Sequence, residues 1–185
     1  MTITGCGIFR EELEHLQPNL PHEVRWVSPG LHTDLDRLGE ELRAEAEGDP
    51  GSAFLFGAAC HPDLPSLAAS RGGEYLPGKD CVAAFLSEEE RRALEARKAF
   101  VITPGWLRHW REIFQEGLHW DEVDARQNFG FYDSIVLLDF GLEPIDDLQV
   151  LEFFEYTQTP IEIVPATLDR FRDQIENLTA PPHGD

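Results

Sequence analysis

The sequence has little positive charge and no long apolar run, and both absences exclude classes of protein. Thirty-five acidic residues stand against 15 basic ones, of which only Lys79 and Lys98 are lysines, so the formal charge is −20. Such a charge repels a phosphate backbone, which excludes DNA and RNA as expected partners. No run of about 18 apolar residues could span a membrane, and the first residues lack the basic start of a signal peptide. We therefore expect a soluble, cytoplasmic protein with no membrane partner.

Familiar nucleotide-binding and catalytic motifs are missing as well. The chain contains no G-x-G-x-x-G, no phosphate-binding G-x-x-x-x-G-K-[ST], no H-E-x-x-H and no G-x-S-x-G. It has three cysteines, but they do not form the Cys-x-x-Cys pair of a zinc ribbon. An odd number of cysteines without an export signal predicts reduced thiols rather than disulfides.

The composition is that of one globular domain. Hydrophobic residues make up 42% of the 185 residues and charged residues 27%, which is ordinary for a globular protein. A chain of this length can bury roughly 70% of its unfolded surface without disulfides or metals to stabilise it. We predict a single domain over residues 1–178, followed by a disordered tail over residues 179–185.

Apolar stretches alternate with amphipathic ones along that domain. Helix start signals lie between the apolar stretches, and the clearest are two capping boxes, Thr33 with Asp36 and Ser87 with Glu90. Alternating strands and helices predict a three-layer α/β fold with a mainly parallel, Rossmann-like sheet and helices on both faces. The predicted strands are 2–9, 24–27, 53–59, 99–103, 134–140 and 161–164.

Residues with reactive or metal-binding side chains lie at or just after the predicted strand ends. Ligands of parallel sheets bind outside these carboxyl ends, so we expect the segments to meet at one rim. The candidate metal ligands are Cys6, His32, Cys60, His61 and Cys81, and the candidate substrate contacts are Thr103, Trp106 and Asp139.

Three interpretations of the cysteines stay open. Cys6, Cys60 and Cys81, with His32 or His61, could hold zinc or another thiophilic metal and leave one position open. An iron–sulfur cluster fits less well, because it usually needs a fourth cysteine. Without a metal, Cys81 would be the nucleophile of a thiol-dependent enzyme, since it precedes a helical pattern whose dipole would lower its pKa. Free cysteines are also often buried, so all three could simply belong to the core.

A series of short motifs resembles a known family. In order, they are Cys6 followed by Phe9-Arg10-Glu11-Glu12-Leu13, Pro29-Gly30-Leu31-His32, Cys60, Asp80-Cys81 and Thr103-Pro104-Gly105-Trp106. This set, within residues 2–142, is similar to the uncharacterised family called domain of unknown function 1638, and all three cysteines fall on family cysteine positions. The chain departs from the family pattern at His61, where a glycine is usual, and at Lys79, where a histidine is usual.

The resemblance implies that the protein is encoded near corrinoid-dependent methyltransferases. It hence implies a role in methyl-group metabolism, with a corrinoid as an associated cofactor. Our main hypothesis is a cytoplasmic metal-binding protein that uses the three cysteines in methyl-transfer or metallocofactor metabolism. One alternative is a metal-free module that binds a small molecule or a protein carrying a metallocofactor. The other alternative is the thiol-dependent enzyme that uses Cys81.

Overall fold

The computed structural model describes residues 2–17, 23–48, 51 and 53–180, and its strands form two parallel sheets. The strands are β1 (Thr2–Cys6), β2 (Glu23–Val27), β3 (Ala53–Leu55), β4 (Ala99–Ile102), β5 (Ser134–Asp139) and β6 (Ile161–Pro165). The first sheet has the order β2-β1-β3 and the second the order β4-β5-β6. Parallel strands flanked by helices confirm the predicted α/β class, with the difference that the described strands form two sheets of three.

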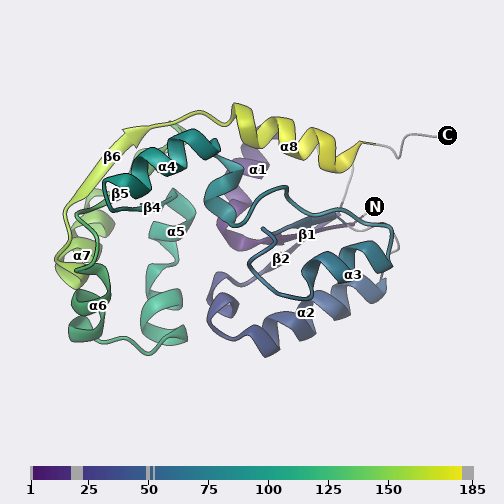
Figure 1. Cartoon of the computed structure of the whole chain (residues 1–185), viewed down its shortest axis with the longest axis horizontal. Helices are drawn as coiled ribbons and strands as arrows, with labels where there is room; N and C mark the ends of the chain where they lie inside the picture. Colours follow the sequence, from purple (N-terminus) through teal and green to yellow (C-terminus); the bar gives the residue numbers. More distant parts are fainter. Residues whose placement is uncertain (1, 18–22, 49–50, 52, 181–185) are drawn as a thin grey trace.

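Helices connect the strands and cover both sheets (Figure 1). The α-helices are α1 (Arg10–Leu16), α2 (Leu35–Gly48), α3 (Leu64–Ser70), α4 (Glu88–Ala96), α5 (Pro104–Arg108), α6 (Glu122–Phe129), α7 (Asp147–Thr157) and α8 (Asp169–Thr179). The shorter helical segments are the 3-10 turns Gly7–Phe9, Pro29–Thr33 and Cys81–Ala84 and the π-helical turn Arg111–Gly117. Among the described residues, no helix is both long and apolar enough to cross a membrane.

The last helix ties the two halves of the chain together. In Figure 1, α8 runs back from the second sheet and lies with α1 on one side of the first sheet, opposite α2 and α3. Phe171 of α8 stacks on Phe9, with 5.3 Å between ring centroids, and both rings are fully buried. Burial of these two aromatic side chains provides a large hydrophobic stabilisation, which holds α8 in place after the chain has run back from the second sheet.

Strand β5 is buried on both faces, as the predicted three-layer arrangement requires. Ile135 and Leu137 pack with the aromatic residues of α6 and α7, whereas Val136 and Leu138 belong to the core that also contains β1. Successive side chains of a strand point to opposite faces, so an unbroken apolar run is needed here. This explains why the run beginning at Ser134 is so apolar in the sequence.

Several predicted boundaries differ from the structure. β1 ends at Cys6 because the chain turns into a 3-10 helix there, and β3 ends at Leu55, so Cys60 lies in the loop that follows. The capping box predicted at Thr33 is wrong, because Asp34 accepts the hydrogen bond that begins α2. Helix α8 continues through Thr179, the first residue of the predicted tail, while residues 181–185 lie outside the described residues.

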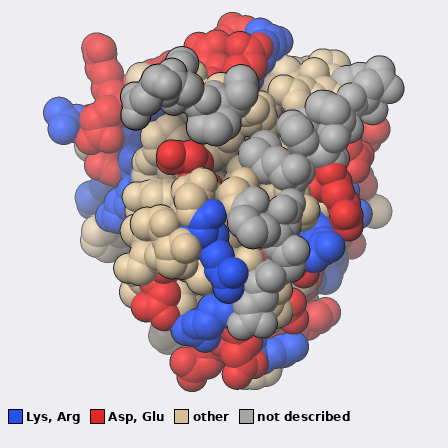
Figure 2. Space-filling view, turned by 90° about the vertical axis from the view of Figure 1, so that its right-hand side faces the viewer, with Lys and Arg blue, Asp and Glu red and all other residues tan. Residues whose placement is uncertain are grey.

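The surface carries charges of both signs in spite of the acidic composition. Figure 2 shows acidic and basic side chains intermixed on the face at the right-hand side of Figure 1. Most basic side chains are exposed arginines that pair with a carboxylate, such as Arg25 with Glu45 and Arg43 with Asp63. Exposed pairs of this kind contribute about 0–1 kcal/mol each, so fold stability rests mainly on the apolar core.

Candidate functional site

The carboxyl ends of the two sheets meet, and glycine makes that contact close. Gly105, at the start of α5 beyond β4, lies against the segment that follows β1, where a Cβ atom would stand 2.2 Å from the carbonyl oxygen of Ile8. Only a residue without a side chain permits this approach. Cys6 at the end of β1 is thereby brought near the residues that follow β4.

The loop that carries Cys60 runs beside the segment that leads to Cys81. Backbone N–H groups of residues 58–59 donate hydrogen bonds of 3.0 and 2.8 Å to carbonyl oxygens of residues 78–79. Gly57 permits this contact as well, because a Cβ there would lie 2.6 Å from the facing backbone. The two cysteines, separate in sequence, are therefore placed together by main-chain hydrogen bonds.

All three cysteines are free thiols in one electrostatic neighbourhood. Burial raises the pKa of Cys6 well above its ordinary value, and charges on Cys81 and Cys60 would raise it further. Burial also raises the pKa of Cys60 to about 11 and that of Cys81 to about 12. Cys6 is 2% exposed and Cys81 7%, while Cys60 is half-buried. Convergence of the three cysteines on one site stays a prediction.

The predicted lowering of the Cys81 pKa is wrong. Cys81 begins a short 3-10 turn rather than a long helix, so burial outweighs any helix dipole. Trp106 partly offsets the effect, because its Nε1–H donates a hydrogen bond of 3.2 Å to the Cys81 sulfur. At neutral pH Cys81 is a protonated thiol, which is a weak nucleophile.

The two candidate histidines have different environments. Both ring nitrogens of His61 are engaged, with Nε2 3.1 Å from the carbonyl oxygen of Leu35 and Nδ1 3.1 Å from the N–H of Asp63. His32 uses only Nδ1, at 2.9 Å from the carbonyl oxygen of Pro29. Burial lowers the pKa of His32, so the neutral ring is favoured. Among the described residues, its Nε2 has no hydrogen-bond partner.

The three predicted substrate contacts have different local roles. Thr103 is fully buried and its hydroxyl accepts the N–H of Trp106 at 3.4 Å, which makes it the cap of α5. The indole of Trp106 contacts the Cys81 sulfur. Asp139 lies at the end of β5, the strand that pairs with β4, and one of its carboxylate oxygens accepts the N–H of Gly141 at 2.8 Å.

Glu112 is a site residue that the sequence reasoning missed. It lies in the π-helical turn and accepts hydrogen bonds from the hydroxyl of Ser28 and the N–H of Gly30, and its Oε2 is 2.8 Å from Nδ1 of His109. Burial would raise its pKa, but these hydrogen bonds outweigh burial and lower it. Its charge acts on Cys6, so the network borders the cysteines. The i, i+3 spacing of His109 and Glu112 was the available sequence signal.

No metal centre is preformed within the described residues, since no three His, Cys, Asp or Glu side chains are arranged to hold an ion.

A comparison with protein families finds one match, over residues 26–175, to a family described as "Protein of unknown function (DUF1638)". The matched region covers most of the chain and includes Cys60, Cys81 and the Glu112 network. The chain matches no curated protein and no solved structure.

Proposed function

We propose that this chain, which belongs to the DUF1638 family of proteins of unknown function, binds a thiophilic metal ion through Cys6, Cys60 and Cys81. The observation that supports the proposal is that all three thiols are free and that main-chain hydrogen bonds hold the loop carrying Cys60 against the segment that leads to Cys81. Thiolate sulfur is the preferred ligand of soft and borderline ions, and zinc is the first candidate. Three protein ligands would leave a fourth position open for a substrate, a partner's ligand or water.

His32 is the candidate fourth ligand, and His61 is not. A histidine that binds a metal usually donates its other ring N–H to a carbonyl or carboxylate, which orients the ring. The contact between Nδ1 of His32 and the carbonyl oxygen of Pro29 follows this pattern and leaves Nε2 available. The ring of His61 instead joins two backbone groups and has no nitrogen to spare.

The thiols would have to close around the ion on binding, because they are not already arranged for one in the described residues. A site that loses three protons and closes on its ion would bind more strongly as the pH rises. A role of the protein in methyl-transfer or metallocofactor metabolism in the cytoplasm stays a prediction. A partner protein that carries a metallocofactor is a prediction as well.

The test is a zinc titration of the full chain, purified without oxygen, reduced and stripped with a chelator. A chromophoric competitor reports the stoichiometry and affinity of zinc. We expect one equivalent of zinc for the wild type and at least about tenfold weaker binding after Cys6→Ser, Cys60→Ser or Cys81→Ser. His15→Gln, which changes an exposed potential ligand on α1, is the matched control and should bind like the wild type.

A cobalt titration adds a spectroscopic readout that separates the loss of a metal ligand from folding defects in the buried variants. Cobalt bound by thiolates absorbs strongly in the near ultraviolet through charge transfer, so the wild type should show this band and Cys60→Ser should lose part of it. Circular dichroism of Cys60→Ser confirms its fold, because this side chain is the least buried of the three. If the wild type takes up no zinc, the metal-free binding module becomes the better hypothesis. The same holds if each of the three cysteine variants binds zinc as well as the wild type does.

A further inference from the structure

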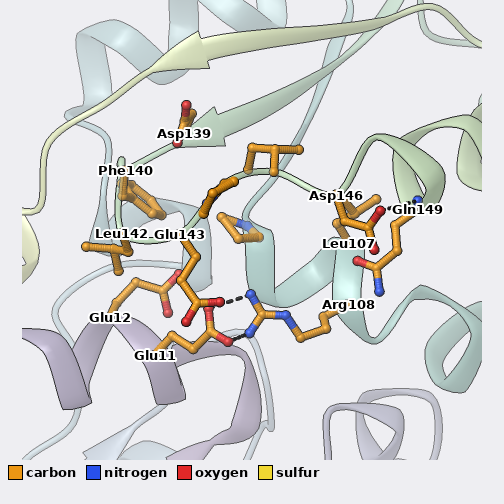
Figure 3. A pocket seen from close by; sticks show the side chains of 13 residues that line it. Glu11, Glu12, Leu107, Arg108, Asp139, Phe140, Leu142, Glu143, Asp146 and Gln149 are labelled. Carbon is orange, nitrogen blue, oxygen red and sulfur yellow. Dashed lines mark hydrogen bonds and ion pairs between the residues drawn. The ribbon is translucent and has the colours of Figure 1, made fainter.

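A cavity of about 200 Å³ lies at the carboxyl end of β5 (Figure 3). Its lining comes from α1, the end of β5, α5, the beginning of α7 and the loop between β5 and α7. None of the three cysteines is among the described residues that line it. The acidic residues of the lining are Glu11, Glu12, Asp139, Glu143 and Asp146.

The negative charge of this cavity is only partly neutralised. Arg108 is the one basic side chain among the described residues of the lining, and its guanidinium group pairs with Glu11, as Figure 3 shows. The positive charge of Arg108 is therefore already engaged by one carboxylate. A single arginine cannot balance the five acidic side chains of the lining, so the cavity keeps an excess of negative charge.

Glu12 shows that this charge is more than an exposed acidic cluster. The side chain is 1% exposed, and its Oε2 atom has no hydrogen-bond partner among the described residues. Figure 3 shows the Glu12 carboxyl group turned toward the side chains that line the cavity. A buried carboxyl oxygen without a partner is costly and rare in native proteins. A ligand that donates a hydrogen bond to this oxygen would remove that cost.

The chemistry of the lining favours an organic cation over a metal ion. Within the described residues, these carboxylates are not arranged as a group of three or more that could hold a metal. An ammonium group brings its own three hydrogen-bond donors, so it can satisfy carboxylates that are spread over a wider area. Apolar side chains that could contact a short carbon chain complete the wall, namely Leu107, Phe140, Leu142 and Ile145.

We propose that this cavity binds a small primary alkylammonium ion, whose nitrogen donates to the unpartnered oxygen of Glu12 and whose carbon chain contacts the apolar wall. The volume limits the ligand to a molecule smaller than those bound by typical cofactor pockets, which measure about 300–1,000 Å³. The site lies beyond the end of a central parallel strand, the position at which α/β proteins bind their ligands. It is independent of the proposed metal site.

The experiment titrates the full chain with n-butylammonium at pH 8, followed by ligand-observed NMR and calorimetry. We expect saturable binding by the wild type and about tenfold weaker binding by Glu12→Gln, which keeps the side-chain shape but removes the charge. Glu14→Gln removes the same charge from an exposed position on α1 and should bind like the wild type. Two further probes of similar size, n-butanol and butyrate, should not compete.

A second variant guards against a folding defect in Glu12→Gln. Glu143 is an exposed member of the lining, so Glu143→Gln should fold normally and weaken binding by about twofold. Absence of saturable n-butylammonium binding would overturn the proposal, and so would equal affinities of wild type and a folded Glu12→Gln. Competition by n-butanol as effective as that of n-butylammonium would show an apolar pocket instead. Each result can be obtained with zinc-free protein, so it stands apart from the outcome of the zinc titration.

Discussion

Replacing Glu12 by glutamine should stabilise the protein at alkaline pH and have a smaller effect in mild acid. Burial raises the pKa of the Glu12 carboxyl group from its ordinary value of 4.5 to about 7. Between these two values the folded state holds a proton that the unfolded state has lost. Stability therefore falls as the pH rises through this window, by about 1.4 kcal/mol for each pKa unit. Glutamine does not ionise, so the variant escapes this loss.

The magnitude follows from the same two pKa values. At pH 8 the wild type has lost about 3 kcal/mol relative to its acid form, and at pH 5.5 about 1 kcal/mol. The stability advantage of Glu12→Gln should therefore grow from about 1 to about 3 kcal/mol between these pH values. This is a large fraction of the roughly 5–15 kcal/mol that stabilises a typical protein, and guanidinium unfolding curves resolve it readily.

The matched control for this prediction is Glu14→Gln. Both substitutions lower the negative charge of the chain by one, so a general relief of repulsion among acidic residues would stabilise both variants equally. Glu12 is buried whereas Glu14 is exposed, so only the Glu12 variant should show an advantage that grows with pH. A constant advantage, or the same pH dependence in Glu14→Gln, would refute the conclusion that this carboxyl group is held in a desolvated position.

Four further outcomes test other parts of the structure. Gly105→Ala should destabilise the protein by about 3 kcal/mol in guanidinium unfolding, because the new Cβ would overlap the carbonyl oxygen of Ile8. Phe171→Ala should cost about 3–5 kcal/mol and increase amide exchange in α8, since this ring is fully buried. Ser87→Ala should cost about 1 kcal/mol through loss of a complete capping box. In the native, metal-free protein at pH 8, Cys60 should react first with an aromatic disulfide reagent, and mass spectrometry of the modified peptides would reveal any earlier reaction of a buried cysteine.

Local signals in the sequence were sufficient where neighbouring residues alone determine the structure. The capping box at Ser87 is formed as predicted, because the hydrogen bonds involved join residues three positions apart. The apolar run from Ser134 forms a buried strand, since a strand covered on both faces needs apolar residues in succession.

Local signals in the sequence were not sufficient where the same residues are compatible with two different local structures. Thr33 and Asp34 both have side chains that can cap a helix, and only the path of the preceding 3-10 turn selects Asp34. Cys81 was expected beside a helix dipole, but the dipole argument needs a helix longer than the short turn that forms there. His61 was a predicted metal ligand by position, whereas its Nε2 contacts the carbonyl oxygen of Leu35 in α2 and its Nδ1 accepts the N–H of Asp63.

By itself, then, the sequence determined the alternation of strands and helices and the family. The tertiary structure alone decided that the strands form two sheets, that Glu112 joins Ser28 and His109, and that Glu12 is buried with a carboxyl oxygen that no described residue contacts by a hydrogen bond. The physical reason is the range of the interactions. Caps and strand patterns arise between residues a few positions apart, whereas burial and charge networks depend on segments that are distant in the chain and meet only after folding.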